Sequence, residues 1–160
     1  MSGLLAARVL ADHFAQVTVV ERDRLATDGR PRKGVPQGRH AHVVLPRGAR
    51  IMEELFPGLL DELVMAGVPF GERLDQFHYE VGGHVFCHEP GPEAVRGGED
   101  DIPLYEPSRP LLEAAVLRRV QSLSNVEFLE GCDVGGLTTD STGRRVTGAR
   151  VVSREDSPAQ

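Results

Sequence analysis

The first 21 residues combine a helix of small and aliphatic residues with a short β-branched strand that ends in a carboxylate. Leucine, valine and alanine recur at helical spacing from Gly3 to His13. The segment from Gln16 to Glu21 is brief, apolar and β-branched, which is typical of a strand buried in a parallel sheet. A helix followed closely by such a strand predicts an α/β fold, because the two form most of a βαβ unit.

A complete βαβ unit needs a strand before its helix, and none precedes Gly3 in this sequence. We therefore expect an incomplete unit whose first strand is missing, with the codons for that strand upstream of Met1.

The rest of the chain alternates between helical and strand-like segments. Helices are predicted at residues 43–55, at 57–66, where Pro57 starts the helix, and at 108–122, where Ser108 caps it. A hairpin is predicted within residues 76–88, around two adjacent glycines. Three strand-like pieces follow, VEFLE, DVGGLTTD and RRVTGARVVS, the last two joined by the turn STG. This order indicates a mixed α/β fold with parallel and antiparallel parts.

Composition and charge exclude several classes of partner. The net charge of −6 disfavours a nucleic-acid-binding surface, since neutralising phosphates needs clustered Lys and Arg. The basic stretch GRPRKGVPQGR is interpreted as a local anion site within a long loop. No apolar run approaches the roughly 20 residues that span a bilayer. Cys87 and Cys132 form no repeated framework, so a reducing cytoplasm is the expected compartment.

Gly3 and Glu21 have the spacing of a dinucleotide-binding unit. Glycines at the start of the helix let the backbone approach a pyrophosphate and let the helix pack closely on the sheet. Glu21 lies eighteen positions after Gly3, at the end of the strand, where a carboxylate can accept hydrogen bonds from the hydroxyls of a ribose. The alternatives are ordinary helix-to-sheet packing for Gly3 and a solvated strand-end carboxylate for Glu21.

Five segments together resemble a known family: SGLLAARVLAD, VTVVERDR, PRKGVPQGRHAH, SRPLLEAAVLRRV and VEFLEGCDV. They are similar to the N-terminal part of the FAD-dependent monooxygenases related to aromatic hydroxylases, also called polyprenyl-methoxyphenol-hydroxylase-like oxidoreductases. The resemblance implies a Rossmann-like FAD-binding domain over residues 1–154, truncated at both ends. It further implies an antiparallel β-meander, a substrate-side hairpin and loop insertion at residues 70–106, and a polar tail at 155–160.

The same resemblance implies a set of cofactor-binding residues. Gly3 matches a glycine of the phosphate loop, Glu21 the ribose ligand, and Arg22 a neighbour of the adenosine. Arg109 matches an arginine close to the flavin or its ribityl chain, and the backbone of Val134 matches a contact of the adenine. Lys33 and Gln37 match residues of a loop along the FAD. The full set is Gly3, Glu21, Arg22, Lys33, Gln37, Arg109 and Val134.

The implied function is hydroxylation or epoxidation of a small organic substrate with FAD, NAD(P)H and oxygen. A cofactor of this kind carries the hard chemical step, so no catalytic side chain is named. A flavin-dependent reductase, a halogenase of the same fold, or a truncated non-catalytic nucleotide-binding fragment are the alternatives. No metal site is expected, because His84 and His88 would face away from Cys87 on a strand.

Overall fold

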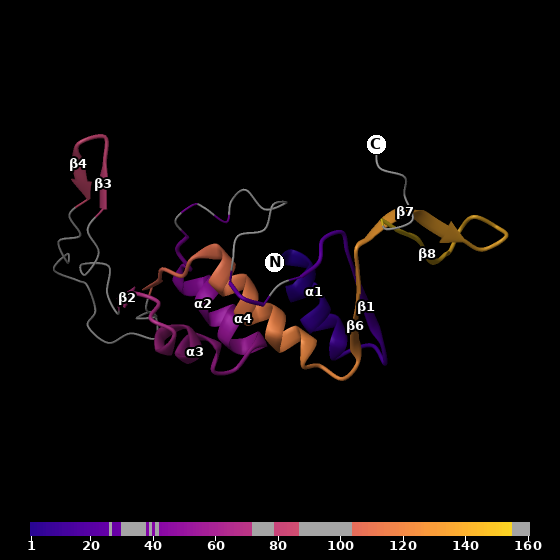
Figure 1. Ribbon diagram of the computed structural model, residues 1–160, viewed down its shortest axis with the longest axis horizontal. Helices are drawn as coiled ribbons and strands as arrows, with labels where there is room; N and C mark the ends of the chain where they lie inside the picture. Colours follow the sequence, from indigo (N-terminus) through magenta and orange to yellow (C-terminus); the bar gives the residue numbers. More distant parts are fainter. Residues whose placement is uncertain are drawn as a thin grey trace. The chain divides into compact units, whose positions relative to one another are not determined.

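The computed structural model describes residues 1–25, 27–29, 38, 40, 42–71, 79–86 and 104–154. The chain divides into two compact units. The strand-pair unit comprises Met1–Arg30 and Val116–Gln160, and the helix-pair unit comprises Pro31–Ala115. Figure 1 labels the elements in chain order. Each unit is described by itself below.

The centre of the strand-pair unit is a pair of parallel strands, β1 (Val17–Glu21) and β6 (Val126–Glu130). Their register runs from Val17 opposite Val126 to Glu21 opposite Glu130. Parallel strands need a long crossover, and here the two strands lie more than a hundred positions apart in the sequence. The pairing therefore brings together two segments that are far apart in the sequence and that no local pattern connects.

Helix α1 (Ser2–Ala11) packs beside β1 (Figure 1). Leu4 and Ala7 are buried on this helix, and Val17 is buried at the start of β1. Asn125 links the helix to the strands, because its side-chain nitrogen donates to the carbonyls of Ala11 and Phe14 at 2.8 and 2.9 Å. The backbone carbonyl of Asn125 also accepts the N–H of Val17 at 2.8 Å. Asn125 thus satisfies the end of α1 through its side chain and meets the start of β1 through its backbone.

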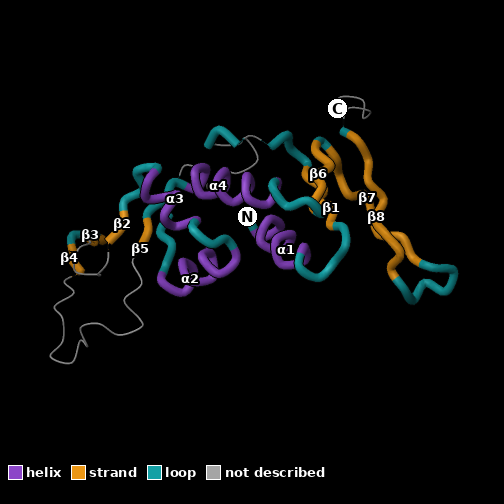
Figure 2. Tube along the Cα trace, turned by 90° about the horizontal axis from the view of Figure 1, so that it is seen from below, coloured by secondary structure: helices purple, strands orange, loops and turns teal. Residues whose placement is uncertain are grey.

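Strands β7 (Cys132–Thr139) and β8 (Val146–Ser153) form an antiparallel ribbon, which Figure 2 shows as a twisted pair. The register shifts between Val134 and Gly136, so the ribbon contains a bulge there. Asp140 organises the turn between the strands, since its Oδ1 accepts from the backbone and the hydroxyl of Thr142 at 3.1 and 2.8 Å.

The helix-pair unit contains α2 (Pro46–Leu55) packed on α3 (Leu59–Met65). Its short strands are β2 (Phe70–Gly71), paired with β5 (Leu104–Tyr105), and β3 (Tyr79–Val81), paired with β4 (His84–Phe86). The buried apolar side chains of this unit are those of Ala49, Met52, Phe56, Leu59, Leu60, Leu63, Val68, Leu104, Tyr105, Leu112, Ala114 and Ala115.

Helix α4 (Arg109–Gln121) contributes residues to both units. Ser108 precedes it and accepts the N–H of Leu111 at 3.4 Å through its hydroxyl, which is the expected cap. Val116, Leu117 and Val120 are almost completely buried. The sequence prediction of a capped helix at this position is confirmed.

Most predicted elements are present within one to three residues of their predicted limits, and two details are corrected. Helix α3 begins at Leu59 and not at Pro57, because Gly58 adopts a positive φ of 78° and the carboxylate of Glu53 accepts the N–H groups of Gly58 and Leu60. The antiparallel β-meander that the resemblance implies is reduced to the two-stranded ribbon of β7 and β8, because β6 (VEFLE) pairs with β1 as a separate strand.

The structure supports a mixed α/β fold, which is coarser than the Rossmann-like sheet that the sequence suggested. Among residues 1–25 and 104–154, parallel pairing is limited to β1 and β6. Two parallel strands do not by themselves make a doubly wound sheet. In the part of the chain that the structure describes, no helix is long and apolar enough to cross a lipid bilayer.

Candidate functional site

The carboxyl-terminal ends of β1 and β6 lie side by side, because the strands are parallel and paired in register. Glu21 and Glu130 are the last residues of their strands and face each other in the pairing. Open α/β sheets bind ligands beyond the carboxyl ends of their strands. We call the region formed by residues 21–25, residues 130–134 and Arg154 the strand-end site.

Two carboxylates hold the segment that follows β1. Glu21 accepts the backbone N–H of Asp23 through Oε1 at 3.0 Å. Glu130 accepts the backbone N–H of Leu25 through Oε2, also at 3.0 Å. The first bond closes a local turn, whereas the second ties the segment to a strand 105 positions away in the sequence. The loop after β1 is therefore ordered from two sides.

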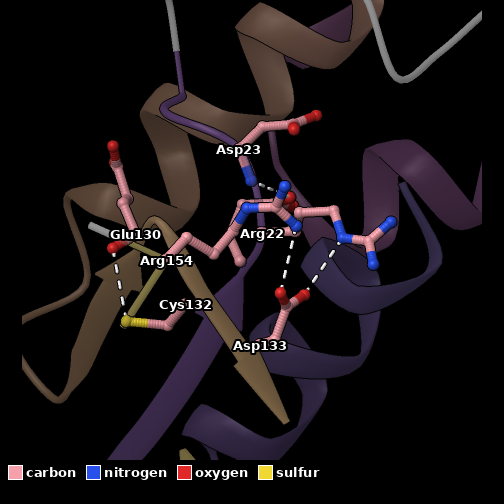
Figure 3. Close-up of polar contacts among 7 residues, drawn as sticks. Arg22, Asp23, Glu130, Cys132, Asp133 and Arg154 are labelled. Atoms are coloured by element: carbon pink, nitrogen blue, oxygen red, sulfur yellow. Dashed lines mark hydrogen bonds and ion pairs between the residues drawn. The ribbon is translucent and has the colours of Figure 1, made fainter. Parts of the chain in front are cut away.

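Asp133 on β7 joins two arginines from different parts of the strand-pair unit (Figure 3). Its Oδ1 accepts the Nε–H of Arg22 at 3.0 Å, and its Oδ2 accepts the Nη1–H of Arg154 at 3.0 Å. The hydrogen bond from Arg22 holds the pKa of the Asp133 carboxyl below its usual range, and the charge of Arg154 acts in the same direction. The pKa of Arg22 is raised by the same bond. Arg22 and Asp133 therefore remain charged at neutral pH.

Cys132 and Val134 flank Asp133 on the same strand. The thiol of Cys132 donates to the carbonyl of Glu130 at 3.4 Å, which links β7 back to the end of β6 (Figure 3). Val134 is opposite Val151 in the ribbon, and 54% of its surface is exposed. The structure thus places Val134 at the strand-end site, with its side chain open to solvent.

Gly3 lies in the first turn of α1, in the strand-pair unit. A Cβ added at Gly3 would meet no atom within 4 Å. Close packing against described residues therefore does not require glycine here, and the expected contribution of Gly3 to helix-to-strand packing has no support. Its expected role beside a pyrophosphate stays a prediction.

Lys33 and Gln37, the two expected side chains of the loop along the cofactor, lie outside the described residues. Their role stays a prediction from the sequence.

Arg109 begins α4 and belongs to the helix-pair unit. Its Nε lies 3.9 Å from Oε2 of Glu113, which is close enough for an ion pair but too long for a hydrogen bond. The Nε is buried and has no hydrogen-bond partner among the described residues. A cation in the first turn of a helix also opposes the helix dipole. Arg109 thus carries a buried donor that an acceptor could satisfy.

The sequence interpretation missed three residues of the strand-end site, namely Glu130, Asp133 and Arg154. Glu130 ends β6, Asp133 is the second residue of β7 and Arg154 directly follows β8, so the available signal was a charged residue near the end of a predicted strand. Their partners depend on the pairing of β1 with β6 and of β7 with β8, which single-strand patterns do not give.

Metal ligation has no support in the part of the chain that the structure describes, where no group of three His, Cys, Asp or Glu side chains is arranged to hold an ion. His84 ends up on β4, while Cys87 and His88 lie outside the described residues.

Comparison with known proteins finds similarity both in sequence and in structure. Protein Rv3254 of Mycobacterium tuberculosis (strain ATCC 25618 / H37Rv) is 44% identical over 130 residues, which is 81% of this chain and 26% of that protein. A crystal structure of a PqsL mutant from P. aeruginosa superimposes with a TM-score of 0.59 at 21% identity, over 93% of this chain and 35% of that one. The chain shares this part of the PqsL fold. It spans about a quarter of Rv3254 and about a third of PqsL.

No family model matches the chain. The assignment to the FAD-dependent monooxygenases related to aromatic hydroxylases, made from the sequence, is corrected, because the matches found are to Rv3254 in sequence and to PqsL in fold, and neither shows that family. What the comparisons support is a chain similar in sequence to part of Rv3254 and similar in fold to part of PqsL. Neither likeness establishes a family, because the first covers a quarter of the relative and the second has 21% identity.

Proposed function

We propose that the strand-end site binds the adenosine half of FAD, and that the chain contributes this half of the cofactor site to an oxidoreductase. The observation that carries the proposal is the position of Glu21, at the carboxyl end of a parallel strand that follows a helix with Gly3 in its first turn. On this proposal α1 and the strand pair belong to a Rossmann-like unit.

The ordering of the loop after β1 supports this proposal. A ribose is recognised by a carboxylate that accepts hydrogen bonds from its hydroxyls. Glu21 is half-buried, and its bond to the N–H of Asp23 restrains its direction before any ligand arrives. A restrained carboxylate loses less conformational freedom on binding than a mobile one, so the same hydrogen bonds give more affinity.

On this proposal, the residues around Glu21 contact different parts of the nucleotide. The charged guanidinium of Arg22 suits the adenosine, because a planar guanidinium stacks on aromatic rings and donates hydrogen bonds. The backbone of Val134, on β7, suits an edge of the adenine. Gly3 would leave the start of α1 open to the pyrophosphate, where helix N–H groups favour an anion.

Arg109 supports an acceptor ligand in the helix-pair unit, argued from that unit alone. Its buried Nε has no hydrogen-bond partner among the described residues, and leaving a buried donor unsatisfied is unfavourable by about 1–3 kcal/mol. We propose that an oxygen or nitrogen of a flavin accepts this bond. Arg109→Lys, which lacks an Nε–H in that position, should then bind flavin more weakly than the unchanged chain.

FAD supplies the redox chemistry when it is bound, and we propose that the reaction is oxygenation of a small organic substrate with NAD(P)H as electron donor. The residues of this chain would bind and orient the cofactor. In a preparation that binds FAD, NAD(P)H oxidation accompanied by oxygen uptake supports an oxygenase. Oxidation without oxygen uptake would assign a reductase instead.

The test is FAD binding by the full chain, followed through flavin absorbance and fluorescence. We expect Glu21→Gln to weaken FAD binding about ten- to hundredfold, since a hydrogen bond to a charged group contributes about 1.5–3 kcal/mol. Glu127→Gln is the matched control, because Glu127 lies on the neighbouring strand and its exposed carboxylate accepts only the hydroxyl of Thr18 among the contacts described. An unchanged chain that leaves flavin absorbance and fluorescence unaltered contradicts the proposal.

A further inference from the structure

The side chain of Arg22 is held at one end and open at the other. Its Nε–H is bonded to Asp133, while its terminal nitrogens make no hydrogen bond to any described residue. The side chain is 68% exposed despite this bond. A guanidinium fixed through Nε keeps its plane and its two terminal nitrogens for another partner.

The carboxylate that holds Arg22 is itself fixed. Asp133 lies within β7, and its second oxygen accepts the Nη1–H of Arg154 (Figure 3). The backbone N–H of Arg154 donates to the carbonyl of Gly131 at 2.8 Å, so this second arginine is anchored to the turn between β6 and β7. Asp133 is therefore oriented from two sides.

The charges of this cluster do not cancel. Two guanidinium groups share one carboxylate, which leaves one positive charge in excess among Arg22, Asp133 and Arg154. Arg22 is the more exposed of the two arginines, at 68% against 47%. The open donors of Arg22 thus lie at the surface immediately after Glu21, and the carboxylates of Glu21 and Asp23 also act on this guanidinium.

We propose that Asp133 is a positioning residue for nucleotide recognition, which sets the place and plane of the Arg22 guanidinium so that it meets the adenosine part of the ligand. The inference rests on the proposed function, because it assigns a task to a neighbour of the proposed nucleotide. Asp133 itself touches no ligand on this account. Its effect passes through Arg22, and Arg154 holds it in place.

A double-mutant cycle with ADP as the probe tests this inference. The full chain and its Asp133→Asn, Arg22→Ala and doubly substituted variants are compared by calorimetric titration with ADP. We expect Asp133→Asn to weaken binding roughly two- to fivefold, which is the range of a well-placed exposed ion pair. In the Arg22→Ala background the same change should have no further effect, since a residue that acts through Arg22 has nothing left to position.

Two controls separate positioning from a general structural effect. Asp140→Asn changes a second aspartate of the same ribbon that also accepts several hydrogen bonds, and it should leave ADP affinity unaltered. Asp133→Glu keeps the charge and should recover part of the lost affinity. The Nε–H signal of Arg22 in a ¹⁵N spectrum reports the contact without any ligand, and it should shift in Asp133→Asn but not in Asp140→Asn.

The outcomes distinguish this inference from the proposed function. If the unchanged chain binds neither ADP nor FAD, the proposed function fails and the inference fails with it. If the chain binds ADP in a manner that depends on Glu21, but Asp133→Asn binds equally well, only the inference is overturned. An equal loss from Asp133→Asn in the presence and absence of Arg22 also overturns it. Should Asp133→Asn fail to fold, Arg22 Nε–H shifts in Asp133→Glu and Arg154→Gln decide the question in the same way.

Discussion

Two aspartates of the β7–β8 ribbon accept several hydrogen bonds each, but they connect very different parts of the chain. Asp140 accepts from Thr142, Arg144 and Arg145, all within five residues of it. Asp133 accepts from Arg22 and Arg154, which are 111 and 21 positions away. The pKa of each carboxyl lies below its usual range because of these bonds. Asp140 shapes a turn, whereas Asp133 assembles the strand-end site.

The difference shows which interactions define the candidate site. A local carboxylate fixes the backbone near it and can do so in many folds. A carboxylate with distant partners makes its hydrogen bonds only when β1 is paired with β6 and β7 is paired with β8. The strand-end site is therefore a product of tertiary structure, and substitutions that disturb distant contacts should affect it most.

The largest expected effect comes from a distant contact at the opposite end of the strand pair. Asn125→Ala removes the donor to the carbonyls of Ala11 and Phe14. We expect the free energy of unfolding to fall by about 1–3 kcal/mol, since the partly buried carbonyl of Ala11 loses its partner. Denaturant unfolding of the full chain measures this. Ser124→Ala, a change at an exposed neighbour, is the control. An equal loss of stability in both variants would show that the hydrogen bonds of Asn125 do not stabilise the fold.

A smaller effect is expected at the local turn. Gly143 has a φ of 69°, and a side chain in this conformation is unfavourable by roughly 1–2 kcal/mol. Gly143→Ala should lower stability by up to that amount, and Gly143→Asn by less, because asparagine tolerates the left-handed region. ADP affinity should stay unchanged in both variants, because the turn lies outside the strand-end site. Weakened ADP binding in either variant would contradict the claim that the turn at Asp140 is separate from the nucleotide site at Asp133.

The sequence predicted the features of this comparison that depend only on neighbouring residues. The turn STG after Asp140 and the helix cap at Ser108 follow from residue types within a few positions. Glu21 at the end of β1 was also predicted, because a β-branched run and its last residue are local features. Asp133 was missed, because its contacts with Arg22 and Arg154 depend on pairing between segments far apart in the chain.

The smallest expected effect is on the pH dependence of the two aspartates. A lowered carboxyl pKa stabilises the fold above the ordinary value of 3.8, and this contribution disappears as the pH falls through the lower folded-state value. Between pH 5 and 7, on the order of one pH unit or more above these values, neither aspartate should change stability. Carboxyl chemical shifts followed by NMR should move only below the ordinary value for both residues. A shift of either one near pH 5 would contradict the contacts described.

The central claim is that the strand-end site receives the adenosine half of a nucleotide. The most direct measurement is a ¹⁵N NMR titration of the full chain with ADP, with backbone signals assigned. The account predicts that the largest shifts fall on residues 21–25 and 130–134. Shifts confined to the turn around Asp140 or to the helix-pair unit, or no shifts at all, would contradict it.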